Sequence, residues 1–275
     1  MLPVEAEEDS NGFRHRAESE AVRITVQGVA IPPIPPIPLI PLSPPLPGNT
    51  PHASMTDLVT VAHERSRARK KALRRKYYPR WETLWPDTPH KERMLADDFA
   101  IAAFLLELFE LAQKPRFVEV GCGNGFLTYL LSQEGAVGRG LDMAPRDFWA
   151  ALDGADLEKA ELPLTDSGSI SYSDHTQGWQ CDWVLANHPD ELTPYVAGLA
   201  AACSASFVTI PCCQWDFGGA RFSRKCGLKS QYASYLDYIE QVADRAGFEY
   251  ARCSLSISSS KNVAIVGTLE PLVGC

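Results

Sequence analysis

A short apolar segment that runs into glycines does most to limit the folds open to this chain. Residues 116–125 read RFVEVGCGNG, and a helical pattern follows directly over 126–133. Without β-carbons at Gly121 and Gly123, the backbone can turn tightly and let a nucleotide-type ligand lie close against it. A strand, a glycine-rich turn and a helix in this order predict the opening unit of a parallel α/β sheet.

Further along the chain, strand and helix patterns continue to alternate, which favours a mainly parallel twisted sheet with helices on both faces. Two final runs alternate like paired strands and predict a C-terminal antiparallel hairpin. The expected strands are 137–143, 182–187, 205–211, 249–258 and 262–270, and the expected longer helices are 91–113 and 230–248.

The N-terminal region differs in composition from the rest. Residues 1–55 join an acidic start to a proline-rich run, which favours extended polyproline II and predicts a disordered tail. A basic helical extension is expected over 56–83, ended by Pro79, and the folded domain over 84–275. No stretch reads as a secretory signal or a membrane span, so we expect a soluble, cytoplasmic protein with no membrane partner.

One basic block stands out against an acidic chain. The net charge is −8, yet residues 65–80 hold nine Lys or Arg and no acid. Such a block can hold nucleic-acid phosphates through counterion release, although a solvated helix face is the ordinary alternative. The residues expected to contact phosphates are Arg69, Lys70, Lys71, Arg74 and Arg75.

The glycine turn also discriminates between cofactors. A dinucleotide fingerprint needs a third glycine where Phe126 stands, whereas Glu119 precedes the turn and makes the motif E-x-G-x-G-x-G. This motif resembles the first motif of class I S-adenosylmethionine-dependent methyltransferases. We expect Asp142 to bind the ribose hydroxyls and Glu119 to hold the polar end of the cofactor indirectly. The residues expected to bind S-adenosyl-L-methionine are Glu119, Gly121, Gly123, Asn124, Gly125, Asp142 and Asn187.

The strand expected over 182–187 ends in the polar sequence Asn-His-Pro-Asp-Glu. Ligands of open parallel sheets lie at the carboxyl ends of the strands, so this exit is well placed for chemistry. It partly matches the D/N-P-P-Y/F tetrapeptide of many class I enzymes. The missing aromatic residue counts against methylation of a base nitrogen and leaves oxygen targets open. We expect Asp190 and Glu191 to cap the helix that follows.

Seven segments recur in a familiar order over roughly residues 84 to 269. They are TPHKERMLADDFAIAAFLLELF, FVEVGCGNGFLTYLL, GRGLDMAPRDFW, LANHPDELTPY, IPCCQWDFGG, SQYASYLDYI and SSSKN. Together they resemble the tRNA (uracil-O(2)-)-methyltransferase family, although Glu119 replaces the usual Asp and Pro189 the usual serine. The resemblance implies a Rossmann-like class I fold, S-adenosyl-L-methionine as cofactor, and methylation of a uridine ribose 2′-hydroxyl in serine tRNA.

Three residues are candidates for the chemistry. Methyl transfer to a hydroxyl is an in-line displacement, so positioning the oxygen supplies much of the catalysis and a base can take the proton. Asn187 can orient the hydroxyl or the cofactor. Either His188 or Lys261 can be the base. The alternatives stay open that His188 braces its loop and that Lys261 contacts a phosphate.

Cysteines Cys203, Cys212, Cys213 and Cys226 raise the question of a metal. No C-x-x-C pair is present, so we expect buried or site-lining thiols and no metal. Two other functions also stay open. The chain can be a methyltransferase acting on a protein or small-molecule oxygen, or an inactive methyltransferase fold that serves as a binding module.

Overall fold

The structure is a computed structural model that describes residues 54–85, 89–162, 171–223 and 227–269. Nearly all of the tail expected over 1–55 lies outside the described residues, as does Cys226. The α-helices are α1 (Met55–Leu84), α2 (Lys91–Ala112), α3 (Phe126–Gln133), α4 (Tyr172–His175), α5 (Val196–Ala202) and α6 (Gln231–Arg245). The strands are β1 (Arg116–Val120), β2 (Val137–Asp142), β3 (Asp156–Lys159), β4 (Trp183–Asn187), β5 (Ser206–Ile210), β6 (Glu249–Ser254) and β7 (Val263–Thr268). Short 3-10 helices are η1 (Asp147–Ala151), η2 (Asp190–Tyr195) and η3 (Phe217–Gly219).

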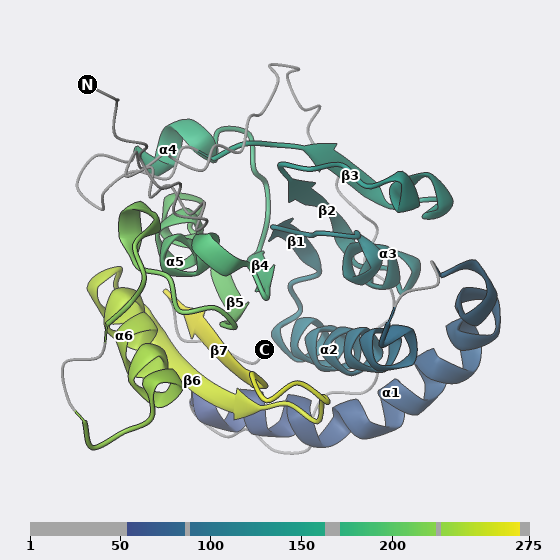
Figure 1. Ribbon diagram of the computed structural model, residues 1–275, viewed down its shortest axis with the longest axis horizontal. Helices are drawn as coiled ribbons and strands as arrows, with labels where there is room; N and C mark the ends of the chain where they lie inside the picture. Colours follow the sequence, from purple (N-terminus) through teal and green to yellow (C-terminus); the bar gives the residue numbers. More distant parts are fainter. Residues whose placement is uncertain (1–53, 86–88, 163–170, 224–226, 270–275) are drawn as a thin grey trace, which may run out of the picture.

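Seven strands form one mixed sheet in the order β3-β2-β1-β4-β5-β7-β6. The first five run parallel, and β7 pairs antiparallel with both β5 and β6. Helices α2 and α3 pack on one face, and α5 and α6 pack on the other (Figure 1). This is the Rossmann-like methyltransferase fold with its C-terminal hairpin, so the predicted fold class is confirmed.

Helix α1 continues past the proline that we expected to end it. Pro79 lies inside the helix, which runs on to Leu84. The buried ring of Trp81 packs edge-on against Phe126 and Tyr129. This aromatic packing offsets the hydrogen bond and the steric fit that proline costs a helix interior. The prediction of a helix end at Pro79 is therefore wrong, and tertiary packing is the reason.

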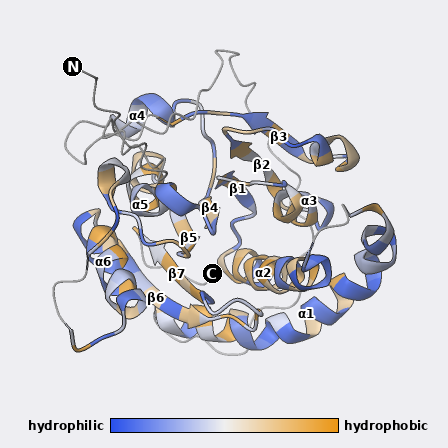
Figure 2. Cartoon of the chain, viewed as in Figure 1, coloured by the Kyte–Doolittle hydropathy of each residue, from blue (hydrophilic) through white to orange (hydrophobic). Residues whose placement is uncertain are grey.

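Helices α1 and α2 lie side by side but differ in surface character. Figure 2 shows α1 as largely hydrophilic and α2 as largely hydrophobic. The inner side of α1 belongs to the same hydrophobic cluster as α2 and α3, so the basic helix is packed onto the fold. Among the described helices, none combines the length and the apolar character that a membrane span requires.

Candidate active site

The glycine turn joins β1 to α3 at the carboxyl edge of the sheet. Its glycines all have left-handed backbone angles, with φ of 70° at Gly121, 56° at Gly123 and 78° at Gly125. A β-carbon at Gly125 would lie 2.5 Å from the side chain of Leu157 in β3, whereas one at Gly123 would meet nothing within 4 Å. Glycine is thus required by conformation at both positions. At Gly123 the turn also borders open space.

Asp142, at the end of β2, organises this turn. Its carboxylate accepts hydrogen bonds from the backbone N–H of Gly123 at 2.8 Å and of Ala144 at 2.9 Å. On the other side, the indole N–H of Trp149 donates to the Gly123 carbonyl at 2.9 Å. Because a carboxylate can accept about four hydrogen bonds, Asp142 keeps acceptor capacity for a ligand hydroxyl.

Glu119 lies buried beneath the turn. Its side chain is only 1% exposed and accepts a hydrogen bond from the Thr128 hydroxyl at 2.5 Å. Burial raises the pKa of Glu119 to about 7, and the charge of Asp142 adds to the rise. Beside it, Asn124 Oδ1 accepts the Phe126 N–H at 2.9 Å at the start of α3. Glu119 and Asn124 therefore support the turn from within the fold.

Sequence reasoning missed Asp98, an acid of α2 that lies near Glu119. Burial raises the pKa of Asp98 well above its ordinary value, and the charges of Glu119 and Asp97 add to the effect. An acid in the first turns of a helix usually indicates a solvated surface, so the sequence offers no signal for its burial. A cationic group bound near these acids would favour their ionised forms.

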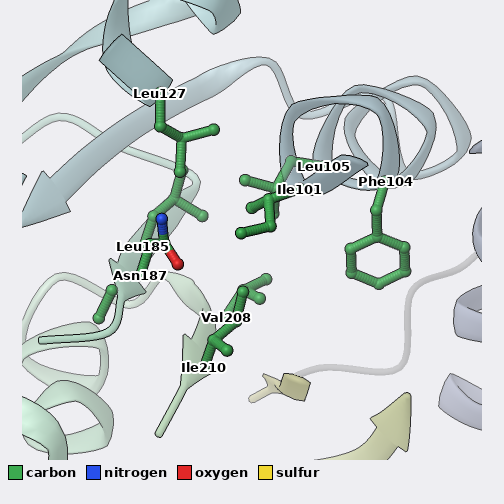
Figure 3. A pocket seen from close by; sticks show the side chains of 9 residues that line it. Ile101, Phe104, Leu105, Leu127, Leu185, Asn187, Val208 and Ile210 are labelled. Carbon is green, nitrogen blue, oxygen red and sulfur yellow. The ribbon is translucent and has the colours of Figure 1, made fainter. Parts of the chain in front are cut away.

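Asn187, the last residue of β4, points its side chain into a small apolar hollow between α2, α3, β4 and β5 (Figure 3). The hollow is lined by Ile101, Phe104, Leu105, Leu127, Leu185, Ala186, Val208 and Ile210. Within the described residues, the buried Oδ1 of Asn187 accepts no hydrogen bond. Leaving a buried acceptor unsatisfied costs about 1–3 kcal/mol, so a bound group that donates to this oxygen would gain by it.

The exit of β4 lies directly against the glycine turn. A β-carbon placed on Gly121 would lie 3.7 Å from the Cα of Pro189. The preceding residue, His188, has a left-handed φ of 52°, and its N–H donates to the Ile210 carbonyl at 3.1 Å. Burial lowers the pKa of the His188 imidazole, against the opposing charges of two nearby acids. The predicted neighbours Gly121 and His188 thus lie at one edge.

Lys261 reaches the same edge from the C-terminal hairpin. Since β7 runs antiparallel to β5, the start of β7 lies beside the carboxyl end of β5. The Lys261 Nζ lies 4.0 Å from the centroid of the Tyr232 ring. The Tyr232 hydroxyl donates in turn to the carbonyl of Pro211, just after β5, at 3.2 Å.

The acids after Pro189 do not behave as expected. Asp190 and Glu191 open η2, but no side-chain hydrogen bond caps this helix. Instead, Asp190 Oδ1 accepts a hydrogen bond from Cys212 Sγ at 3.2 Å. Burial and this carboxylate raise the pKa of the Cys212 thiol to about 12. The capping role predicted for Asp190 is therefore wrong, because its side chain turns toward the cysteines after β5.

The basic block divides into two groups on α1. Arg69 forms ion pairs of 2.5 Å with Glu107 and with Glu110 of α2, and the Lys70 Nζ donates to the Ser256 carbonyl at 3.1 Å. These two cations tie α1 to the fold. The exposed cations of the block that form no ion pair within the described part of the chain are Arg65, Arg67, Lys71, Arg74 and Arg75.

Several known proteins are similar to this chain. Residues 61–159 match the family model described as "Predicted AdoMet-dependent methyltransferase". A Homo sapiens protein named "Probable tRNA (uracil-O(2)-)-methyltransferase" is 38% identical over 199 residues, which are 69% of this chain and 25% of that protein. A Neurospora crassa "tRNA (uracil-O(2)-)-methyltransferase" is 31% identical over 228 residues, covering 71% of this chain and 45% of that protein. The predicted family resemblance is confirmed.

The extent of these matches sets their meaning. The chain spans only a quarter of the human relative and under half of the fungal one. The family model begins at residue 61, inside α1, so the resemblance starts earlier than residue 84. Its description agrees with the predicted cofactor, S-adenosylmethionine. Among solved structures, Streptomyces venezuelae DesVI aligns with a TM-score of 0.43 and 15% identity, over 67% of this chain and 100% of that one.

Proposed function

We propose that this chain is an S-adenosylmethionine-dependent methyltransferase that modifies a uridine ribose 2′-hydroxyl in serine tRNA in the cytoplasm. The observation that carries the proposal is one sheet edge, where the open turn at Gly123 and the acceptor Asp142 adjoin the unpaired Asn187. The names of the relatives support tRNA and uracil as the target. The ribose oxygen and serine tRNA rest on the family resemblance.

The residues at this edge fit the cofactor. Gly123 leaves room beside the turn, and Asp142 has acceptor capacity for the ribose hydroxyls. The acids Asp98 and Glu119 suit a ligand that carries positive charge. When bound, S-adenosylmethionine supplies an activated methyl group on a positive sulfonium.

On the acceptor side, Asn187 holds the target hydroxyl or the cofactor through its unpaired Oδ1. His188 follows it directly at the strand exit, so we assign to His188 the removal of the hydroxyl proton. Lys261 stacks its ammonium group on the Tyr232 ring. That arrangement keeps a positive charge at the edge of the site and suits contact with an RNA phosphate.

The exposed cations of α1 provide the RNA contact in this proposal. Neutralising Lys71, Arg74 and Arg75 together should weaken tRNA binding and lower the slope of log affinity against log salt by up to about 3. Arg69→Met is the matched control, because Arg69 is held by Glu107 and Glu110 of α2. It should cost stability and leave the salt slope nearly unchanged. An unaltered slope in the triple variant would make this face a solvated surface only.

The function itself is tested by mapping 2′-O-methyl groups in tRNA from cells with and without this chain. Loss of one uridine methylation in serine tRNA is the expected result. Methyl transfer to a protein or a small molecule instead would replace the substrate in the proposal. A rise in melting temperature with S-adenosylmethionine, without any transfer, would favour an inactive binding module.

A further inference from the structure

Three metal-ligating side chains meet beside the β4 exit and have no part in the proposed methyl transfer. A carboxylate oxygen of Asp190 and the Sγ atoms of Cys212 and Cys213 lie within 4.8 Å of one another. They come from two loops, one after β4 and one after β5. The parallel pairing of these strands, with Asn187 opposite Ile210, brings the loops together.

The backbone at Asp190 is adapted to this arrangement. Its φ of 46° is left-handed, a conformation that costs a non-glycine residue roughly 1–2 kcal/mol. The side chain is exposed and forms no ion pair with the described residues. In place of capping η2, the carboxylate faces the two half-buried thiols. Both charge and access are thus available to a cation.

We propose that Asp190, Cys212 and Cys213 bind a thiophilic divalent cation of the Zn²⁺ type, with water as the fourth ligand. Two sulfurs and one carboxylate oxygen are donors that zinc takes at about 2.3 Å and about 2.0–2.2 Å. Tetrahedral bonds of this length place two sulfurs about 3.8 Å apart. The observed separations therefore need side-chain movements of only about 1 Å.

Binding exchanges protons for the ion. Each thiol loses its proton to solvent as the S–metal bond forms, whereas the carboxylate is already ionised, so one ion releases two protons. The bound ion clamps the loop after β4 to the loop after β5. It thereby fixes residues 187–190 next to the glycine turn, without entering any step of methyl transfer.

The test uses the reduced full chain with Co²⁺ as a spectroscopic probe. One equivalent of Co²⁺ should produce thiolate-to-cobalt absorption bands, release two protons and be displaced by Zn²⁺. Cys212→Ser, Cys213→Ser and Asp190→Asn should each weaken Co²⁺ binding at least about tenfold, since each removes one of the few ligands of the ion. Cys203→Ser is the control, because this half-buried thiol lies after α5 and outside the cluster, and it should leave the spectrum unchanged.

Two results would overturn the proposal. One is the absence of thiolate bands in the unaltered chain; the other is the same bands in the Cys212→Ser, Cys213→Ser double variant. Circular dichroism and melting of the metal-free variants check that each has folded, and Asp190→Asn preserves side-chain size. A melting shift with S-adenosylmethionine reports on the proposed function separately, so the two proposals can fail independently.

Discussion

The two halves of the candidate site are built differently. The cofactor half, residues 119–125 and 142, pairs its polar groups internally through Asp142, Asn124 and the Glu119–Thr128 bond. The acceptor half, residues 187–190 and 261, contains a buried unpaired oxygen and two non-glycine residues with left-handed backbones. The first half is thus formed in advance, whereas the second holds groups that a ligand has to satisfy.

The largest effect should come from blocking the open side of the cofactor half. Gly123→Trp forces a side chain into the space beside the turn at a positive φ, so the rise in melting temperature with S-adenosylmethionine should disappear. Gly178→Trp is the matched control, because Gly178 also has a positive φ and open space but is exposed and follows α4. A cofactor response retained in Gly123→Trp would place the ligand elsewhere.

In the acceptor half, the base and the phosphate contact should separate kinetically. His188→Ala removes the proposed base and should lower kcat by about 10²–10⁴-fold with little change in KM for tRNA. Lys261→Met removes a charge stacked on Tyr232 and should mainly raise KM. The opposite pattern in steady-state kinetics would exchange the roles of these two residues.

The buried acid of the cofactor half should leave a signature in stability against pH. With its pKa raised to about 7, native Glu119 keeps a proton that the unfolded chain has already released. Stability should therefore fall as pH rises from the ordinary glutamate value to about 7, by roughly 3 kcal/mol in all. Glu119→Gln should remove this slope and be more stable than the unaltered chain at alkaline pH. Denaturant unfolding across the range measures it, and an unchanged slope would assign it to another group.

The two asparagines give the smallest and most direct comparison. Asn124 accepts the Phe126 N–H, so Asn124→Ala should lower the free energy of unfolding by about 1 kcal/mol. Asn187 accepts nothing within the described residues, so Asn187→Ala should change stability by less than about 0.5 kcal/mol while methyl transfer falls. Equal losses of stability would mean that the acceptor half is preformed too.

Much of the cofactor half could be predicted because its parts are close in the chain. The turn follows β1 and opens α3, and Asp142 bonds to Gly123 only 19 positions before it. Hydrophobic periodicity likewise predicted α2, α6 and the C-terminal hairpin. Strand β3 escaped prediction because its sequence, DLEK, is polar and partly exposed at the sheet edge.

Partner choice depended on the tertiary structure. Asp190 meets Cys212 from 22 positions away and Arg69 meets Glu107 from 38, and no local pattern encodes either contact. Pro79 stays within α1 because Trp81 packs on a distant aromatic cluster. Periodicity and turn chemistry act between near neighbours, so the sequence by itself determined the order of elements and the glycine turn. Only packing of the sheet decided which acids, thiols and cations face one another.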